Sequence, residues 1–392
     1  TGTTPIAATV FIPEHRAGEK YPLIVHSHGW GGSRATAANA VPDDDPAADF
    51  FDRVDRQVFE LWTRGYGVIS FDERGWGQSG GQVRSMDPMF ETRDAIAVVD
   101  WAVANMDVAK DANGDPLIGA IGGSYGGGFQ LLLAALDPRI DAITPAATWN
   151  DLEQSVVPNG VILKGFAGGL CILAAATGAR LDPAVEQSCQ EGYYTLSNRF
   201  VEQITPSVIE FLAAHGLGAF ERDPGFVMRP VDALFVHGPR DVLFNFNQAL
   251  ANYRYLQAAG GDVRILTTQG SHILGAPFSS QQPQGPANCG AIDGMASIRA
   301  WLDAKLRGNT QAIAGIPEIC MSLDNDQGVN LDAVPFGSAA YTVTLPATSV
   351  TGSNRNTPDD TAVFIPLGAP ISGDGRVLAG VPTADLDVQP TV

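Results

Sequence analysis

A serine set among glycines is the feature that most limits how this chain can fold. The segment AIGGSYGGGF, residues 120–129, holds one serine and one tyrosine among five glycines. Glycine is the costliest residue to order, and it alone tolerates positive φ and very close backbone approach without a steric penalty. Because ordered apolar sequence abuts the segment on both sides, a flexible spacer is excluded. The sequence predicts a turn too tight for side chains.

The flanking sequence says what kind of turn this is. An apolar run, LIGAIGG, predicts a strand over 117–123, and GGGFQLLLAALD is compatible with a helix over 126–137. Between them, Gly122 to Gly126 match the pattern G-x-S-x-G in a strand–turn–helix setting. In that setting the glycines let the chain turn sharply and expose a serine hydroxyl at the end of a sheet. We therefore expect Ser124 to be a nucleophile.

The same alternation of strand and helix runs through most of the chain. Short β-branched runs predict strands, and longer stretches between them carry apolar residues at helical spacing. The strands are expected at 8–12, 22–29, 67–72, 117–123, 141–149, 231–238 and 262–270, and the helices at 52–65, 93–106, 246–260 and 294–308. Strands alternating with helices imply an α/β fold, with a mainly parallel sheet covered by helices on both faces.

Two segments break this rhythm and suggest a division into four parts. Residues 151–228 hold a glycine-rich apolar run and helical stretches without a strand, which predicts a helical cap inserted into the sheet scaffold. The core is then formed by 1–150 and 229–312. The segment 313–392 has no lysine, two arginines and nine acidic residues. Alternating apolar and polar runs in it predict a small β-rich appendage.

A serine hydroxyl is a weak nucleophile near neutral pH, so it needs a base and an acid that orients the base. In G-x-S-x-G hydrolases the chain order is serine, acid, histidine. His272 lies in a loop just after a predicted strand, where an imidazole can reach the serine. Asp241 follows the preceding strand by a short turn at the same sheet edge. Asp262 begins the strand predicted over 262–270, so it lies at the opposite edge of the sheet and is the weaker candidate for the acid.

The remaining histidines have less suitable positions. His237 ends a strand and is expected to be structural, His215 lies inside the predicted cap, and His15 lies in an early turn. When a serine attacks a carbonyl group, negative charge develops on the carbonyl oxygen, and two backbone N–H donors are needed to stabilise this oxyanion. We assign them to Tyr125, directly after the nucleophile, and to Trp30 in the glycine-rich loop HGWGGS. The Trp30 indole is also a candidate wall of the acyl pocket.

Composition excludes some partners. The chain is 45% hydrophobic and carries a formal net charge of −19, which argues against nucleic acid and anionic membranes as partners. Its longest uncharged apolar run, 165–178, is shorter than the roughly 20 residues of a membrane span. No signal peptide is visible and the chain opens at Thr1, so we expect a mature, secreted or periplasmic form. The oligomeric state cannot be read from the sequence.

The four cysteines form no C-x-x-C pair, so we expect neither zinc nor another metal or cofactor. Two disulfides in an oxidising compartment fit this pattern, with four buried thiols in a cytosolic protein as the alternative. Sequence spacing favours Cys171–Cys189 and Cys289–Cys320. Two acidic segments, 110–116 and 322–328, resemble calcium loops superficially. The first lacks the distal glutamate such loops require, and we expect both to be turns.

Five motifs, HGWGG, FDERGWGQSGG, GGSYGGG, HGPRD and GSH, occur in the order found in α/β-hydrolase-fold serine hydrolases. Residues 1–312 resemble the acyl-esterase group that includes cocaine esterase and the X-prolyl dipeptidyl peptidases, and also bacterial carboxylesterases that accept bulky or polymeric esters. Two departures stand out. The group often uses a tyrosine side chain as oxyanion donor, whereas HSHGWGG resembles the backbone-donor version. The group's large C-terminal jelly roll is replaced here by the short segment 313–392.

The resemblance implies a serine carboxylesterase that acts through an acyl-enzyme on small or polymeric esters. The apolar cap run, with Phe166, Leu170, Ile172 and Leu173, favours hydrophobic acyl or alkyl groups.

The alternative activity is an X-prolyl dipeptidyl peptidase. That activity would need a cap carboxylate for the substrate amine, for which Glu153, Glu186 and Glu191 are candidates. A non-catalytic hydrolase fold that acts as a binding module is disfavoured by the intact serine, aspartate and histidine set.

Overall fold

The computed structural model describes residues 3–40, 48–158, 162–194, 205–272, 287–323 and 327–333. The chain divides into two compact units, Thr1–Asp332 and Ala333–Val392. All the helices and strands described below belong to the first unit. The alternating runs that predicted strands near the C-terminus, and residues 195–204 of the predicted helical cap, lie outside the described residues.

A nine-stranded sheet forms the centre of the first unit, with the order β1-β3-β2-β4-β5-β6-β7-β10-β11 in the described part of the chain. The strands are β1 (Ala8–Phe11), β2 (Leu23–Ser27), β3 (Gly67–Phe71), β4 (Ile118–Gly123), β5 (Ile140–Ala146), β6 (Asp232–His237), β7 (Val263–Thr267), β10 (Ile319–Ser322) and β11 (Gly328–Leu331). All neighbours from β3 to β10 pair in parallel, whereas β1 and β11 pair antiparallel at the two edges. A short antiparallel pair, β8 (Asn288–Cys289) and β9 (Ile292–Asp293), lies outside this sheet.

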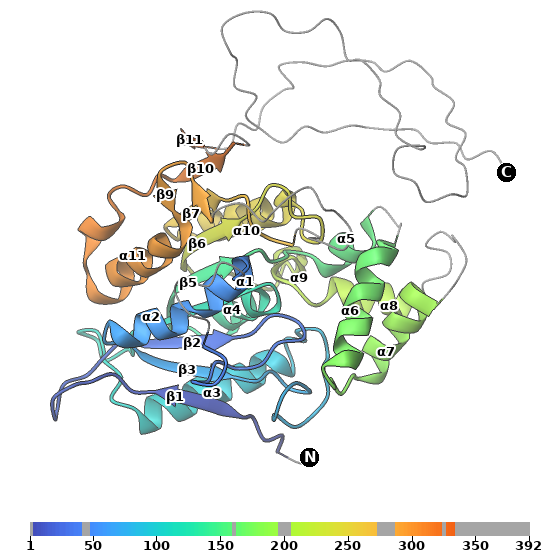
Figure 1. The fold of residues 1–392 in the computed structure, drawn as a ribbon, viewed down its shortest axis with the longest axis horizontal. Coiled ribbons are helices and arrows are strands. Elements are labelled where there is room, and N and C mark those ends of the chain that lie inside the picture. Colours follow the sequence, from blue (N-terminus) through green and yellow to red (C-terminus); the bar gives the residue numbers. More distant parts are fainter. Residues whose placement is uncertain are drawn as a thin grey trace, which may run out of the picture. The chain divides into compact units, whose positions relative to one another are not determined.

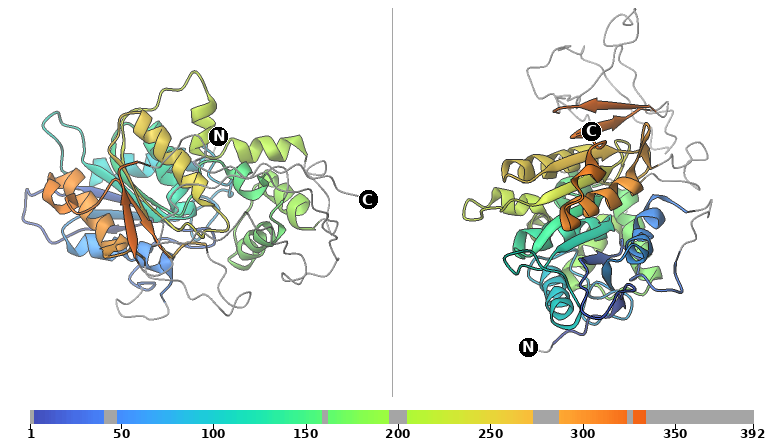
Figure 2. Two further views of the ribbon diagram at one scale, coloured as in Figure 1. Left: turned by 90° about the horizontal axis from the view of Figure 1, so that it is seen from above. Right: turned by 90° about the vertical axis from the view of Figure 1, so that its left-hand side faces the viewer.

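Helices cover both faces of the sheet, as the apolar strands require. Every residue of β2 and of β4 is buried, which is typical of parallel strands with helices on both sides. One face carries α1 (Phe50–Asp55), α2 (Gln57–Thr63) and α11 (Gly294–Arg307). The other carries α3 (Glu91–Asn105), α4 (Tyr125–Leu136) and α10 (Phe246–Ala258), as the views in Figures 1 and 2 show. The predicted α/β fold is confirmed.

The expected elements are present with small changes of boundary. The helix predicted over 52–65 is two helices, α1 and α2, which meet at Arg56. The change is local, because Arg56 keeps right-handed helical backbone angles. Asp49 caps α1 by accepting a hydrogen bond from the Asp52 amide. The sheet continues past residue 312 through β10 and β11, while the four-part domain division remains a prediction.

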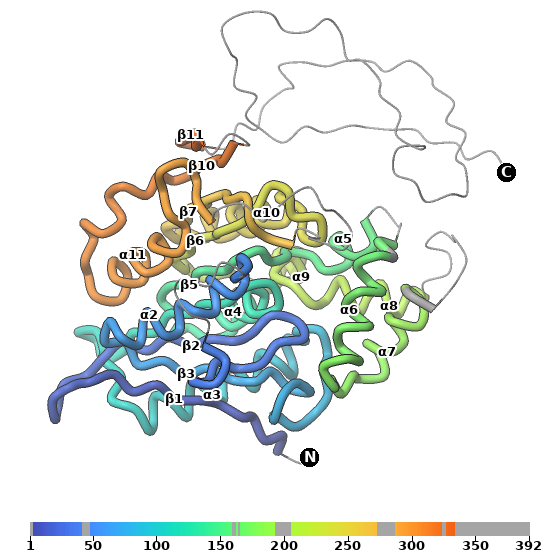
Figure 3. Tube along the Cα trace, in the orientation of Figure 1, coloured from blue at the N-terminus to red at the C-terminus, as the bar shows by residue number. Residues whose placement is uncertain are grey.

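Helices alone make up the regular structure described between β5 and β6. They are α5 (Leu152–Val156), α6 (Lys164–Ala176), α7 (Pro183–Cys189), the π-helical turn η2 (Gln190–Tyr194), α8 (Pro206–Ala213) and α9 (Leu217–Arg222). Figures 1 and 3 show α6, α7 and α8 gathered beside the sheet. Val83 forms a β-bridge with Leu181, and Arg84 Nη1 lies 2.6 Å from Asp182 Oδ2. These contacts tie the helical segment to the loop after β3.

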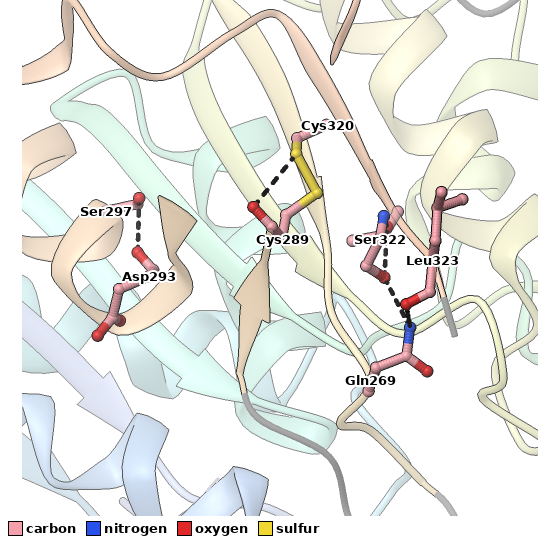
Figure 4. Close-up of a disulfide and its surroundings, with 8 residues drawn as sticks. Gln269, Cys289, Asp293, Ser297, Cys320, Ser322 and Leu323 are labelled. Atoms are coloured by element: carbon pink, nitrogen blue, oxygen red, sulfur yellow. Dashed lines mark hydrogen bonds between the residues drawn. A yellow bond between two sulfur atoms is a disulfide. The ribbon is translucent and has the colours of Figure 1, made fainter. Parts of the chain in front are cut away.

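Both predicted disulfides are present. Cys171–Cys189 joins α6 to α7, and Cys289–Cys320 joins β8 to β10 (Figure 4). Next to the second bond, Gln269 Nε2 donates to Ser322 Oγ at 3.2 Å, which ties the end of β10 to the loop after β7 (Figure 4). Disulfides persist in oxidising compartments, so both bonds are consistent with an extracellular or periplasmic protein.

The acidic segment 110–116 is a turn, as expected. Asp111 Oδ1 accepts hydrogen bonds from the amides of Asn113 and Asp115, and Lys110 bridges to Pro116 just before β4. The second acidic segment falls partly outside the described residues. Within the part of the chain that the structure describes, no helix combines the length and apolar character that a membrane crossing demands.

Candidate active site

The predicted turn around Ser124 lies between β4 and α4. Ser124 itself has φ 57° and ψ −117°, a strained conformation for a residue with a side chain. The flanking glycines explain how the chain accommodates it. A methyl group on Gly126 would lie 2.1 Å from the Ser27 carbonyl oxygen, and one on Gly122 would lie 2.5 Å from the Gly126 carbonyl oxygen. Only glycine fits at these two positions, so the turn requires the G-x-S-x-G pattern.

The structure brings Ser124, His272 and Asp241 together, although 148 residues separate Ser124 from His272 and 31 residues separate His272 from Asp241. His272 Nε2 lies 2.8 Å from Ser124 Oγ, and His272 Nδ1 lies 2.7 Å from Asp241 Oδ2. Asp241 follows β6 and His272 follows β7, so both loops leave the carboxyl edge of the sheet where β4 also ends. These distances suit proton transfer from a serine hydroxyl to an imidazole that a carboxylate orients.

The surroundings fix both partners of the serine. The Asp241 side chain is sealed from solvent and that of His272 is 13% exposed. Asp241 Oδ1 accepts hydrogen bonds from the amides of Leu243 and Phe244 at 2.9 and 2.7 Å. Burial on its own would raise the pKa of Asp241, but the charge and hydrogen bond of His272 outweigh it, and the pKa is lowered. Asp241 is thus held as a carboxylate.

Two aromatic rings pack against the imidazole of His272. The rings of Phe51 and Phe244 lie 4.7 and 5.0 Å from the His272 ring, measured between centroids. No sequence motif marks Phe244 as a partner of the histidine. Phe51 comes from α1, which is far from the other groups in sequence, and no local pattern marks it.

The competing candidates lie elsewhere, as expected. His237 is buried at the end of β6, where its Nε2 lies 2.7 Å from the Phe244 carbonyl oxygen, and burial lowers its pKa. Asp262 lies at the start of β7, at the opposite edge of the sheet, and its Oδ2 is 2.8 Å from Lys305 Nζ. His215 is buried in the helical segment and its Nε2 is 3.7 Å from Asp87 Oδ2.

The two residues assigned to the oxyanion flank the serine turn. Tyr125 is the first residue of α4, and the first amides of a helix have no partner within it. The Trp30 amide donates to no other described residue, and a methyl group on the adjacent Gly29 would lie 3.9 Å from Ser124 Cβ. The Trp30 and Tyr125 rings pack edge to face with centroids 5.3 Å apart. The loop that holds Trp30 and the start of α4 therefore meet beside Ser124.

A cavity of about 100 Å³ opens beside Ser124. Its walls come from the core and from the helical segment 151–228, and Trp30 connects the two because its Nε1 donates to the Leu170 carbonyl oxygen at 2.9 Å. Besides Ser124, the lining residues are Trp30, Ser85, Tyr125, Trp149, Leu152, Val156, Val157, Ile162, Ala167, Leu170, Cys171, Val185, Ser188, Cys189, Gly192, Val208, Leu212, Leu243 and Phe244. None of these described residues is charged.

The apolar run on α6 contributes less to this cavity than the sequence suggested. Leu170 lines it, together with Ala167 and Cys171. The expectation was wrong for Ile172 and Leu173, whose side chains are 54% and 42% exposed. Neither residue lines the cavity, and a methyl group on Gly31 would lie 2.7 Å from Leu173 Cγ, so Leu173 lies beside the loop that holds Trp30. Phe166 is half-buried but does not line the cavity.

The acidic residues of the helical segment do not reach the cavity. Glu153, Glu186 and Glu191 are absent from its described lining. Glu191 instead accepts a hydrogen bond from the Thr205 amide at 2.8 Å, which connects the turn after α7 to the start of α8. In the described residues, no group of three or more histidine, cysteine or acidic side chains is arranged to hold a metal ion.

Comparisons with known proteins give the chain a family. A model described as X-Pro dipeptidyl-peptidase (S15 family) matches residues 2–274. An uncharacterized 31.7 kDa protein in the traX-finO intergenic region of Escherichia coli is 30% identical over 150 residues, which is 37% of this chain and 43% of that protein. The uncharacterized protein PA2218 of Pseudomonas aeruginosa is 26% identical over 162 residues, 41% of this chain and 36% of its own length. These matches span less than half of either relative.

A solved structure supports the fold. The CocE/NonD family hydrolase from Staphylococcus aureus superimposes with a TM-score of 0.57 over 87% of this chain and 56% of that chain, at 15% identity. At this identity the likeness shows the fold alone. The family match covers most of the sheet and the serine turn, and the chain therefore belongs to the X-Pro dipeptidyl-peptidase (S15) family and has an α/β-hydrolase-like fold.

Proposed function

We propose that the protein is a serine carboxylesterase that hydrolyses esters with hydrophobic acyl or alkyl groups. Ser124 Oγ attacks the ester carbonyl carbon while His272 Nε2, 2.8 Å away, takes the hydroxyl proton. His272 then gives this proton to the leaving alcohol. Water attacks the acyl-enzyme in the second half of the reaction, again with His272 as base and then as acid, and the carboxylic acid leaves.

Asp241 and two backbone amides complete the proposed machinery. Asp241 holds the imidazole in the tautomer that presents a free Nε2 to the serine, through the 2.7 Å hydrogen bond from Nδ1. The amides of Trp30 and Tyr125 stabilise the negative charge that develops on the carbonyl oxygen. Removing one such donor typically lowers turnover about 10²–10³-fold.

The uncharged cavity is the observation that favours an ester over a peptide end. An X-prolyl dipeptidyl peptidase must hold the ammonium group of its substrate, and a buried charge needs a paired partner. The described lining offers no carboxylate for that purpose. Apolar groups gain from such a cavity about 0.8 kcal/mol for each methylene that leaves water.

In this proposal the helical segment 151–228 acts as a cap over the ester group, because thirteen of the described residues that line the cavity belong to this segment. Polymeric esters are candidate substrates if their chain ends reach Ser124. The two disulfides support a location outside the cytoplasm.

The test is a substrate panel on the purified protein. It contains p-nitrophenyl esters of increasing acyl length and X-Pro p-nitroanilides, assayed by release of the chromophore. We expect ester hydrolysis that rises with acyl length, with little amide cleavage, and Ser124→Ala should retain about a millionth of the turnover. Efficient cleavage of X-Pro anilides with weak ester hydrolysis would establish the peptidase alternative instead. Full activity of Ser124→Ala would refute the nucleophile.

A further inference from the structure

Two consecutive residues with side chains adopt left-handed backbone angles close to the cavity. Ser85 has φ 56° and Met86 has φ 66°, in the loop between β3 and α3. Left-handed angles are uncommon for any residue other than glycine, asparagine or aspartate, and two in succession are rarer still. Such strain persists only where the surroundings impose it, and it gathers at ligand sites.

Buried groups from two helices impose this conformation. Glu91 of α3 accepts hydrogen bonds from the Arg84 amide at 2.6 Å and the Asp87 amide at 3.1 Å. The Tyr125 hydroxyl, from the residue after the nucleophile, accepts one from the Met86 amide at 2.9 Å. Glu91 is fully buried, and this burial raises its pKa to about 8. The amides on both sides of Ser85 are therefore fixed.

What this loop presents to the cavity is the side chain of Ser85. The residue lines the cavity together with Ser124 and is 7% exposed. Its hydroxyl forms no hydrogen bond with any other described residue, and it is not one of the described polar atoms that are sealed from solvent without a partner. Its oxygen is therefore reachable from the cavity.

The other hydroxyl groups of the described lining are already engaged. Ser124 Oγ lies against His272, and the Tyr125 hydroxyl accepts from Met86. Ser188 Oγ donates to the Ala184 carbonyl oxygen at 2.8 Å. Among the described residues that line this mostly apolar cavity, Ser85 thus has the single hydroxyl without a hydrogen-bond partner.

We propose that Ser85 is a specificity-determining residue whose hydroxyl binds a second oxygen, a hydroxyl or a carbonyl, on the acyl group of the ester. This proposal rests on the ester hydrolysis proposed above and narrows it to acyl chains that carry oxygen beyond the ester bond. Hydroxy and oxo acyl groups share the required chemistry, because a serine hydroxyl can accept from the former and donate to either.

The experiment compares matched ethyl esters by acid release at constant pH. Ethyl butyrate has no oxygen beyond the ester group, whereas ethyl 3-hydroxybutyrate and ethyl 3-oxobutyrate differ from it only at acyl carbon 3, which carries a hydroxyl or is a carbonyl. In Ser85→Ala, kcat/KM should fall about two- to tenfold for the oxygen-bearing ester that the site prefers, the effect of one neutral hydrogen bond, and ethyl butyrate should be unaffected. Ser85→Gly should behave alike, which excludes backbone strain as the cause because glycine accepts positive φ.

Ser188→Ala is the matched control, since it removes an engaged hydroxyl from the same cavity. It should leave the ratio of oxygen-bearing to plain esters as in the wild type. An unchanged ratio in both Ser85 variants, or an equal change in Ser188→Ala, would overturn the assignment. So would an effect confined to 2-hydroxyethyl butyrate, which carries its extra hydroxyl on the alcohol. If the wild-type protein cleaves none of these esters, the proposed function fails instead.

Discussion

Replacing Asp241 with asparagine tests how the three side chains act together, because the structure dictates which way the amide must face. Asp241 Oδ1 accepts hydrogen bonds from the amides of Leu243 and Phe244, and Oδ2 accepts from the imidazole Nδ1 of His272. The His272 backbone amide also donates to Oδ2, at 3.2 Å. In Asp241→Asn, an NH₂ group that faces His272 loses this one backbone donor, whereas the flipped amide loses both Leu243 and Phe244, so we expect the NH₂ group to face His272. An NH₂ group donates, so Nδ1 must then accept.

The consequence is the wrong tautomer at the serine. With Nδ1 as acceptor, the proton of a neutral imidazole lies on Nε2, 2.8 Å from Ser124 Oγ, and the ring cannot take the serine proton. The corresponding substitution in a serine protease triad lowers kcat about 10⁴-fold, or about 5.4 kcal/mol of transition-state stabilisation. Because the substrate cavity is not altered, we expect a much smaller change in KM.

The assay is steady-state hydrolysis of a p-nitrophenyl ester that the wild type cleaves, with circular dichroism and thermal unfolding to show that the fold is retained. Asp262→Asn is the control, since Asp262 lies at the opposite edge of the sheet beside Lys305. It should keep wild-type turnover. Turnover of Asp241→Asn above a tenth of the wild-type value, or an equal loss in Asp262→Asn, would refute the reasoning.

Three further changes probe the turn, the cavity and a buried histidine. Gly126→Ala would place a methyl 2.1 Å from a carbonyl oxygen and should lower the free energy of unfolding by about 1–3 kcal/mol or more, whereas Gly165→Ala, with open space around it, should not. Leu170→Asp should flatten the roughly fourfold gain in kcat/KM per acyl methylene while an acetate ester is still cleaved, and Ile172→Asp, at an exposed position, should keep the wild-type profile. Burial lowers the pKa of His215 from 6.5 to about 4. Between these two pH values the folded state binds fewer protons than the unfolded state, so the free energy of unfolding falls as the pH drops. The melting temperature of His215→Asn should therefore fall less steeply than that of the wild type as the pH drops over this range. Parallel curves of melting temperature against pH would contradict the lowered pKa of His215.

The sequence was most informative where local chemistry leaves few alternatives. Ser124 could be recognised because the glycines around it serve one purpose, and the structure shows the backbone oxygens that exclude any side chain at Gly122 and Gly126. His272 and Asp241 could be predicted because each comes just after a predicted strand, and the carboxyl ends of parallel strands lie at the same edge of the sheet. The disulfide pairs followed from proximity in the chain, and both are present.

Long-range packing accounts for what the sequence did not reveal. Phe51 reaches His272 from a helix far away in the chain, and Trp149 lines the cavity just after β5. The strained pair at Ser85 and Met86 depends on Glu91, whose role is visible only once α3 lies against α4. On α6, apolar content alone could not tell the cavity face from the solvent face, and Ile172 was misassigned for that reason.

The arrangement of the sheet explains why family membership and substrate class can separate in a protein like this one. Ser124, Asp241 and His272 follow β4, β6 and β7, whereas most of the cavity wall comes from the connection between β5 and β6. That connection can change its lining without moving the strand ends that hold the three side chains. In the proposed function, the serine chemistry stays at the strand ends, and the described cavity wall, which is uncharged, offers no carboxylate to a peptide amine. We therefore expect the residues of the wall to decide the substrate, and the ester panel with the Ser85 and Leu170 variants tests this expectation.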